Sequence, residues 1–335
     1  MRVVLRADAD DKRGTGHVMR CLTLAESLLA SGHDVRLLGS IESVPWLERR
    51  VEGAGLDVVA CAPDSLDTAV VRSTAPDWLV IDSYSISAAQ ISEVNEGLRC
   101  LAIIDGDDRG IDASLYLDQN LGAETKRWRE PVLSRLLGGS SYCLIRDAVL
   151  HYSRVHRTEV THTPPHVVAF MGGSDPLGLM LEAVDCLIRA DLGIRLTAVC
   201  GPSTWAPVTE RAKSHSWIDV IGPTDSLPEL LGSADAVVSA SGTSVWELCT
   251  LAVPSVVVAV VDNQRMAVTS VNETGVAIGV DATRGSPHVW DDVGAAVGRV
   301  LADETLRRSL IDRCRKNFDG KGKRRVVRAM ERGLL

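Results

Sequence analysis

The chain has 335 residues, of which 45% are hydrophobic and 24% charged, and its formal net charge is −8. This length exceeds one comfortable hydrophobic core and favours two domains of ordinary globular composition. The acidic balance argues against a general nucleic-acid binder, because such proteins need a basic face.

Cysteine usage and hydropathy narrow the class of protein further. The eight cysteines are scattered and no two form a C-x-x-C pair, so we expect buried free thiols in a reducing compartment. The longest apolar run, 253–261, is too short to cross a bilayer and contains Pro254. We therefore expect a cytoplasmic, monomeric enzyme with neither a membrane nor a nucleic-acid partner.

The first half of the chain alternates apolar strands with amphipathic helices. Strands are predicted at 2–7, 34–38, 57–61, 78–82, 100–104 and 115–118, and helices at 17–31, 44–53, 66–73 and 86–96. Strands that are apolar throughout and separated by helices predict a parallel sheet covered on both faces. Ligands bind such sheets beyond the carboxyl ends of the strands, so the polar strand ends at 8–17, 82–84 and 105–109 are site candidates.

A polar segment at 156–166 contains Pro164-Pro165 and lacks an apolar period, which predicts an interdomain linker. The alternation then restarts. Strands are predicted at 166–171, 195–200, 219–221, 236–240, 255–260 and 276–280, helices at 179–190, 227–233 and 245–251, and a helical pair follows near the C-terminus. The sequence therefore predicts an α/β chain of two doubly wound, Rossmann-like domains, 1–157 and 166–315, with a basic, solvated helix at 316–335.

The turn after the first predicted strand carries the most suggestive local pattern. Gly14-Thr15-Gly16 precedes a helix, so backbone N–H groups and the positive end of the helix dipole point at whatever binds there. His17 at the helix start can take up a proton near neutral pH. The alternative is a tight turn capped by a solvated histidine. Met19 occupies the third glycine position of G-x-G-x-x-G, so the dinucleotide fingerprint is incomplete.

Two loops of the second half have the composition of a diphosphate site. Gly172-Gly173-Ser174 and Ser241-Gly242-Thr243-Ser244 each follow a predicted strand, and small residues let backbone N–H groups approach phosphates. Glu247, one turn into the next helix, can accept hydrogen bonds from ribose hydroxyls. The alternative for each loop is an ordinary tight turn, and the alternative for Glu247 is a carboxylate that is merely favoured near a helix start.

Metal binding is the weaker interpretation of the acidic strand ends. Asp8-Ala9-Asp10 and Asp105-Gly106-Asp107 match the D-x-D pattern that holds a divalent metal in some sugar-transfer enzymes, but the pattern is too short to be specific. The histidines of 156–166 lack acidic or cysteine partners nearby. We predict neither a metal nor a cofactor.

Taken in order, the motifs resemble a known family. The stretch R-A-D-x(5)-G-T-G-H-V-M-R-C-L-T-L-A at 6–25 resembles the first motif of the UDP-sugar hydrolases of the pseudaminic acid pathway. Those enzymes are relatives of the undecaprenyl-linked N-acetylglucosaminyl transferase of peptidoglycan synthesis. The further matches are I-D-S-Y at 81–84, L-D-Q-N-L-G-A at 117–123, G-G-S-D-P at 172–176, S-G-T-S-V-W-E-L at 241–248 and N-Q at 263–264.

The resemblance implies a two-domain GT-B fold, with a UDP-sugar between the domains and the nucleotide mainly on the second. By position, it implies that His17 is the general base or positions the water, that Tyr84 and Asn263 line the sugar site, and that Asp8 flanks it. It also implies diphosphate and ribose contacts from Gly173, Ser174, Ser241, Gly242, Thr243, Ser244 and Glu247. Gly14, Gly16 and Gln264 complete the predicted substrate-binding residues.

The predicted function is hydrolysis of a UDP-linked amino-deoxy sugar to the free sugar and UDP. A water activated by His17 would attack the anomeric carbon opposite the leaving UDP and invert that centre. A GT-B glycosyltransferase with a hydroxyl acceptor is the first alternative, and a nucleotide-sugar sensor without catalysis is the second.

Overall fold

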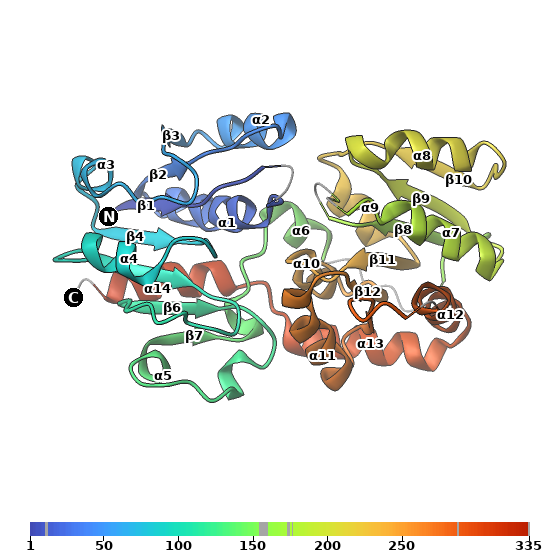
Figure 1. Cartoon of the computed structure of the whole chain (residues 1–335). Helices are drawn as coiled ribbons and strands as arrows, with labels where there is room; N and C mark the ends of the chain where they lie inside the picture. The colour runs from blue at the N-terminus through green and yellow to red at the C-terminus, as the bar shows by residue number, and fades with distance from the viewer. Residues whose placement is uncertain (11–12, 154–159, 173–174, 176, 287, 334–335) are drawn as a thin grey trace. The chain divides into compact units, whose positions relative to one another are not determined.

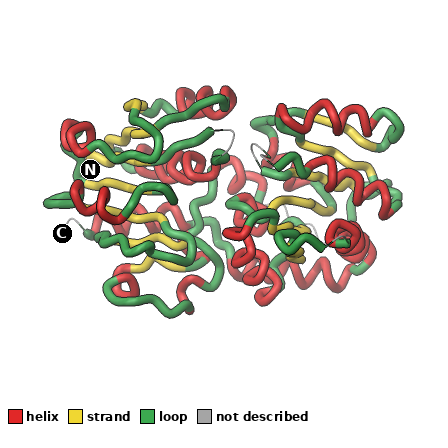
Figure 2. Tube along the Cα trace, viewed as in Figure 1, coloured by secondary structure: helices red, strands yellow, loops and turns green. Residues whose placement is uncertain are grey.

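The computed structural model describes all residues except 11–12, 154–159, 173–174, 176, 287 and 334–335. The chain divides into two compact units. Unit 1 comprises Met1–Leu144 and Gly320–Leu335, and unit 2 comprises Ile145–Asp319. In each unit, helices flank a sheet of strands (Figures 1 and 2).

The described part of unit 1 contains one seven-stranded parallel sheet, in the order β3-β2-β1-β4-β5-β6-β7. Its strands are β1 Arg2–Arg6, β2 Asp34–Gly39, β3 Asp57–Ala60, β4 Trp78–Ile81, β5 Arg99–Ile103, β6 Leu115–Asp118 and β7 Leu136–Gly138. Strand β1 lies inside the sheet, with β2 and then β3 on one side of it. Strand β4 pairs with β1 on the other side. The carboxyl ends of β1, β4 and β5 therefore lie next to one another.

Helices cover both faces of this sheet. They are α1 Gly16–Ala30, α2 Pro45–Gly53, α3 Thr68–Ser73, α4 Ala88–Val94, α5 Val132–Arg135 and α14 Gly322–Arg332, with single 3₁₀ turns at Ala123–Thr125 and Ser140–Tyr142. Alternate strand residues point to opposite faces. Val3 and Leu5 pack in one core with α1, α2 and α14, whereas Val4 packs in a second core with side chains of α3, α4 and α5.

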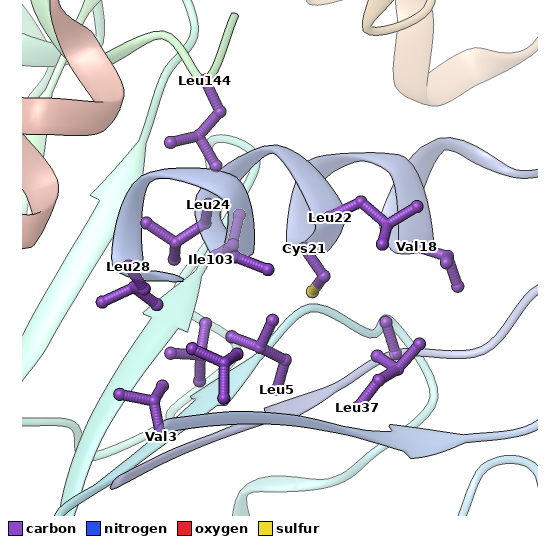
Figure 3. Packing of buried hydrophobic residues seen from close by; sticks show 14 of the residues in the cluster. Val3, Leu5, Val18, Cys21, Leu22, Leu24, Leu28, Leu37, Ile103 and Leu144 are labelled. Carbon is purple, nitrogen blue, oxygen red and sulfur yellow. The ribbon is translucent and has the colours of Figure 1, made fainter. Parts of the chain in front are cut away.

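Helix α1 lies across the centre of the sheet and carries the site histidine at its start. Its inner face buries residues one turn apart, and Figure 3 shows Cys21 and Leu28 directed toward the strand residues Leu5 and Val3, with Val18 on the side of Leu37. Burying each large aliphatic side chain of this kind is worth about 1.5–3 kcal/mol. The first turn of α1 is therefore held in place by the core beneath the rest of the helix.

The C-terminal helix α14 belongs to unit 1, although the sequence suggested a separate, solvated helix. Its apolar side chains Val326, Val327 and Met330 are buried in the same core as α1. Lys323 is also buried, and its Nζ lies 3.2 Å from Glu26 Oε2 on α1. The exposed basic residues Arg324, Arg328 and Arg332 therefore lie on the outer face of an amphipathic helix, whereas Lys323 lies on its buried face.

The described part of unit 2 contains a six-stranded parallel sheet, in the order β10-β9-β8-β11-β12-β13. Its strands are β8 His166–Phe170, β9 Arg195–Val199, β10 Ile218–Ile221, β11 Ala236–Ala240, β12 Ser255–Ala259 and β13 Ile278–Asp281. Its helices are α6 Asp147–Tyr152, α7 Met180–Ala190, α8 Pro202–Ala212, α9 Leu227–Ser233, α10 Ser244–Leu251, α11 Arg265–Thr274, α12 Val289–Ala302 and α13 Glu304–Asn317, with a 3₁₀ turn at Asp262–Gln264.

The two faces of this second sheet are also covered. Side chains of α7, α8 and α12 share one core with alternate strand residues such as Val167 and Val238. Helices α10 and α11 contact strands β11, β12 and β13. The pattern of two doubly wound α/β units agrees with the fold class predicted from the sequence.

The passage between the units differs from the predicted boundary at 157. The chain enters unit 2 at Ile145, because Ile145 and Val149 are buried and α6 contacts α9 and α10 of that unit. All eight cysteines are free, and every one except Cys61 is buried, which confirms the prediction of buried thiols. No helix among the described residues combines the length and hydrophobicity that a membrane span requires.

Candidate active site

The carboxyl edge of the unit 1 sheet gathers the three polar strand ends that the sequence singled out. His17 lies in the first turn of α1, after β1. Asp82 directly follows β4, and Asp105 follows β5. Because these strands are neighbours in the sheet, the three side chains come within reach of one another.

The imidazole of His17 is held by Asp82. His17 Nδ1 lies 2.6 Å from Asp82 Oδ1, and the Asp82 side chain is only 1% exposed. Burial disfavours the charge on Asp82, but the charge of Arg20 and the contacts with His17 and Arg20 together outweigh burial and lower the pKa of this carboxyl below its usual range. An ionised carboxylate only accepts hydrogen bonds, so Nδ1 carries a proton, and in the neutral imidazole the lone pair is then on Nε2. This arrangement makes Nε2 a base.

Arg20 is the centre of the cluster, and the sequence analysis missed it. Its Nε donates to Asp82 Oδ2 at 2.7 Å, and one terminal nitrogen donates to Asp82 Oδ1 at 2.6 Å. The same guanidinium donates to both oxygens of Asp105, at 2.8 and 3.0 Å. Burial opposes its charge, yet the two carboxylates raise the pKa of Arg20 well above its ordinary value. Its spacing of three residues from His17, on one helix face, was the available signal.

Tyr84 joins the cluster through Asp105. The Tyr84 hydroxyl donates to Asp105 Oδ2 at 2.6 Å. Its ring meets the His17 imidazole edge to face, with centroids 4.8 Å apart. Burial and the nearby Asp105 charge raise the pKa of Tyr84, so the phenol keeps its proton. The residue is nevertheless 50% exposed, so its ring can contact a ligand while fixing the histidine.

A second layer supports Asp105. Asn120 Nδ2 donates to Asp105 Oδ1 at 3.1 Å and to Asp118 Oδ1 at 2.8 Å. Asp118 Oδ2 accepts from the backbone N–H of Gly106 at 2.8 Å, which ties the end of β6 to the loop after β5. Asn120 and Asp118 lie in the L-D-Q-N-L-G-A stretch, but nothing in their local pattern assigned them to this cluster.

Asp8, which the resemblance places beside the sugar site, has a different set of contacts. Its Oδ1 accepts from Arg6 at 2.6 Å and from the Ser40 N–H at 2.9 Å, and its Oδ2 accepts from the Asp64 N–H at 3.1 Å. Burial opposes the charge, but these donors, led by Arg6, lower the pKa of Asp8. The carboxylate therefore organises the loops after β1, β2 and β3, and none of its partners among the described residues is His17.

The glycine turn has the geometry that its composition predicted. Gly14 has a φ of 81°, a conformation that favours glycine. Its N–H donates to the carbonyl of Asp10 at 3.1 Å, and Gly16 is the first residue of α1. The described residues contain no group of three or more His, Cys, Asp or Glu side chains arranged to hold a metal ion.

In unit 2, the loop Ser241–Thr243 connects β11 to α10, and Ser244 is the first residue of that helix. The Ser241 side chain is buried, and its Oγ has no partner among the described residues. A Cβ on Gly242 would meet nothing within 4 Å, so the loop backbone is open on that side. The predicted residues Gly173 and Ser174 lie outside the described residues.

The other predicted residues of unit 2 have distinct surroundings. Glu247, in the first turn of α10, forms a two-pronged ion pair with Arg146, with both N–O distances 2.6 Å. Gln264 Oε1 accepts from the Val260 N–H at 3.0 Å, which closes the turn after β12. Asn263 is exposed in this turn. Asn263 and Glu247 thus belong to a different unit from His17 and Tyr84.

Comparison with known proteins assigns the architecture. Residues 167–289 match the glycosyltransferase family 28 C-terminal domain. The spore coat polysaccharide biosynthesis protein SpsG of Bacillus subtilis is 21% identical, over 99% of this chain and 98% of SpsG. The uncharacterized protein MJ1062 of Methanocaldococcus jannaschii is 22% identical over 77% of this chain, and the match spans only 55% of MJ1062.

Solved structures agree over almost the whole chain. The spinosyn forosaminyltransferase SpnP superposes with a TM-score of 0.69 at 16% identity, over 99% of this chain and 98% of SpnP. MurG of Acinetobacter baumannii gives 0.65 at 14% identity, over 99% of each chain. This protein has the GT-B fold, and its residues 167–289 are similar to the C-terminal domain of glycosyltransferase family 28. MnaA of S. aureus, solved with UDP, gives a TM-score of 0.70 at 14% identity, over 99% of this chain and 96% of MnaA. At such identities the structures show the fold alone.

Proposed function

We propose that this GT-B protein hydrolyses a UDP-linked amino-deoxy sugar, of the UDP-2,4-diacetamido-2,4,6-trideoxyhexose type, to the free sugar and UDP. One observation carries the proposal. His17 is fixed by the buried, ionised Asp82 so that the lone pair of the neutral imidazole is on Nε2. A histidine oriented in this way is suited to remove a proton from an attacking water.

The chemistry follows from this geometry. As water attacks the anomeric carbon, Nε2 of His17 accepts its proton, and Asp82 stabilises the imidazolium that forms. The C1–O bond to the diphosphate breaks, and UDP leaves with the electron pair. Attack on the face opposite the leaving group inverts the anomeric centre. Tyr84, bonded to Asp105, restricts the imidazole to the orientation that this step requires.

The leaving group needs stabilisation by donors rather than by an acid. The backbone N–H groups at the start of α10, after the loop Ser241–Thr243, are suited to receive a diphosphate. The family 28 C-terminal domain match includes this loop. The related folds solved with UDP (MnaA) and with dTDP (VinC) support a nucleoside diphosphate as the ligand class, and the name of SpsG supports a sugar pathway.

Glycosyl transfer is the second candidate, because the matched domain family and the structures of SpnP and VinC are those of glycosyltransferases. In that reaction an acceptor hydroxyl replaces water, and His17 removes its proton instead. The fold itself does not choose between water and an acceptor.

The test is incubation with a UDP-2,4-diacetamido-2,4,6-trideoxyhexose in oxygen-18 water, without metal or acceptor. We expect UDP release, the label on the sugar C1 hydroxyl rather than on phosphate, and an inverted anomer in the first NMR spectra. A sugar that binds but stays intact until an acceptor alcohol is added would replace the hydrolase with the transferase. Binding without turnover under either condition would indicate a sensor.

Two histidine variants make the test specific. His17→Gln removes the proposed base and should abolish release. His33→Gln is the matched control, because His33 also lies in unit 1 and pairs with a carboxylate, Glu331, at 3.0 Å. Loss of activity in both variants to the same degree would count against a special role for His17.

A further inference from the structure

A largely buried ion pair in unit 2 adjoins the proposed nucleotide site, and neither the sequence motifs nor the comparisons assign it a role. Arg146 Nε donates to Glu247 Oε1, and a terminal nitrogen of Arg146 donates to Oε2, both at 2.6 Å. The side chains are only 12% and 16% exposed. Parallel, short, charge-assisted bonds of this kind fix both the position and the plane of a carboxylate.

The two residues come from distant parts of the chain. Arg146 immediately precedes α6, close to the point at which the chain enters unit 2 at Ile145. Glu247 lies in the first turn of α10, directly after the loop Ser241–Thr243. Helices α6 and α10 are in contact, so the guanidinium reaches the carboxylate from a neighbouring helix.

The pair leaves Glu247 able to bind a ligand. Each carboxylate oxygen has two acceptor sites, and Arg146 occupies one on each oxygen. The remaining sites suit two vicinal hydroxyl groups. A glutamate without such a partner samples several rotamers, and the N–H groups at the start of its own helix compete for its charge.

We propose that Arg146 is a positioning residue, which holds the Glu247 carboxylate in the orientation that accepts hydrogen bonds from the ribose hydroxyls of the bound nucleotide. The inference rests on the proposed nucleotide site of unit 2. It adds that recognition of the ribose depends on a residue outside every motif and on the segment that enters unit 2.

The experiment compares UDP with 2′,3′-dideoxy-UDP by calorimetric titration of the full-length protein. Hydrogen bonds to a charged group make the native protein prefer UDP by about ten-fold or more. We expect this preference to disappear in Glu247→Ala. In Arg146→Met we expect the ratio of the two affinities to fall close to one, while the affinity for the dideoxy nucleotide changes little. The double variant should lose no further discrimination.

A merely structural role would give a different pattern. If the pair only braces α10, Arg146→Met weakens both nucleotides equally and leaves their affinity ratio at the native value, which overturns the inference. Arg146→Lys keeps the charge but not the two-pronged geometry, and we expect it to lose most of the preference while remaining folded. Arg189→Met is the matched control, since it removes an exposed pair with Asp291 in the same unit.

Failure of the inference and failure of the proposed function are distinguishable. Absence of UDP binding by the native protein would overturn the nucleotide site, and the role of Arg146 with it. Tight UDP binding with unaltered discrimination in Arg146→Met would overturn only the role of Arg146.

Discussion

Asp82→Asn tests the centre of the proposed mechanism. The substitution preserves shape but replaces one acceptor oxygen with an NH₂ donor. Arg20 donates to both oxygens of Asp82, and His17 donates to one of them. Whichever way the amide turns, its NH₂ group faces an N–H donor. In either orientation one bond from Arg20 is lost, and with the NH₂ group at the Oδ1 position the imidazole must also take the other tautomer and give up the lone pair on Nε2.

The expected losses are large for both activity and stability. Removing an orienting carboxylate lowers kcat by about 10,000-fold in the serine-protease arrangement, and we expect a fall of about 100-fold to 10,000-fold here. Leaving the buried Arg20 with an imperfect partner costs about 3–5 kcal/mol of unfolding free energy. The other contacts of Arg20, to Asp105, remain.

The assay is UDP release under single-turnover conditions between pH 6 and 9, with folding checked by thermal denaturation. His33→Gln supplies the comparison for a lost histidine–carboxylate contact elsewhere in unit 1. A folded Asp82→Asn protein within about three-fold of the native kcat, with an unchanged pH profile, would refute the proposed orientation of His17, since a general base contributes about 100-fold or more.

Three further outcomes concern stability. Asp8→Asn should lower the unfolding free energy by about 3 kcal/mol in urea, because it removes the charge that pairs with the fully buried Arg6. Gly39→Ala should destabilise more than a typical surface change, because a Cβ there would overlap the carbonyl oxygen of Ala7. Stability should fall in acid, because the pKa values of Asp8 and Asp105 are lowered in the folded state. Such groups stabilise the fold above their unfolded pKa of about 3.9, and this contribution disappears as the pH drops through the folded values.

Each of these outcomes has a clear contrary result. Asp8→Asn with native stability but no turnover would assign Asp8 a catalytic role instead. A Gly39→Ala protein as stable as the native one would mean that the strand end shifts without cost. An Asp8→Asn protein with the same acid transition as the native protein would show that Asp8 does not contribute to the loss of stability in acid.

Much of the framework was predictable from the sequence, because it depends on local periodicity. Strand β11 and helix α9 have the predicted bounds, and most other elements differ by one or two residues. Helix α3 was predicted at 66 but begins at 68, because Asp67 caps it by accepting hydrogen bonds from two backbone N–H groups. A capping signal of this kind can be recognised in a sequence.

Other elements gave a misleading local signal. Helix α8 was missed because it starts at Pro202, directly after Gly201, and contains Pro207, and these residues usually mark loops. The apolar residues of α6 and α14 indicate amphipathic helices, but not the core that they enter. Packing places α6 in unit 2 and returns α14 to unit 1.

The residues of the candidate site also fall into those that local sequence identifies and those that it does not. His17 and the glycines of the first turn were identifiable because a strand, a glycine turn and a helix are adjacent in the sequence. The strand ends that carry Asp82 and Asp105 were identifiable as site candidates, but their contacts with the first helix were not, since Arg20 reaches Asp82 and Asp105 across 62 and 85 residues. Which strand ends meet depends on the order of the strands in the sheet. Parallel strands are joined by crossovers, and a crossover can place the next strand on either side of the sheet; here β4 lies beside β1. Local periodicity contains no information on that choice, so only the tertiary structure decided which charges surround the histidine.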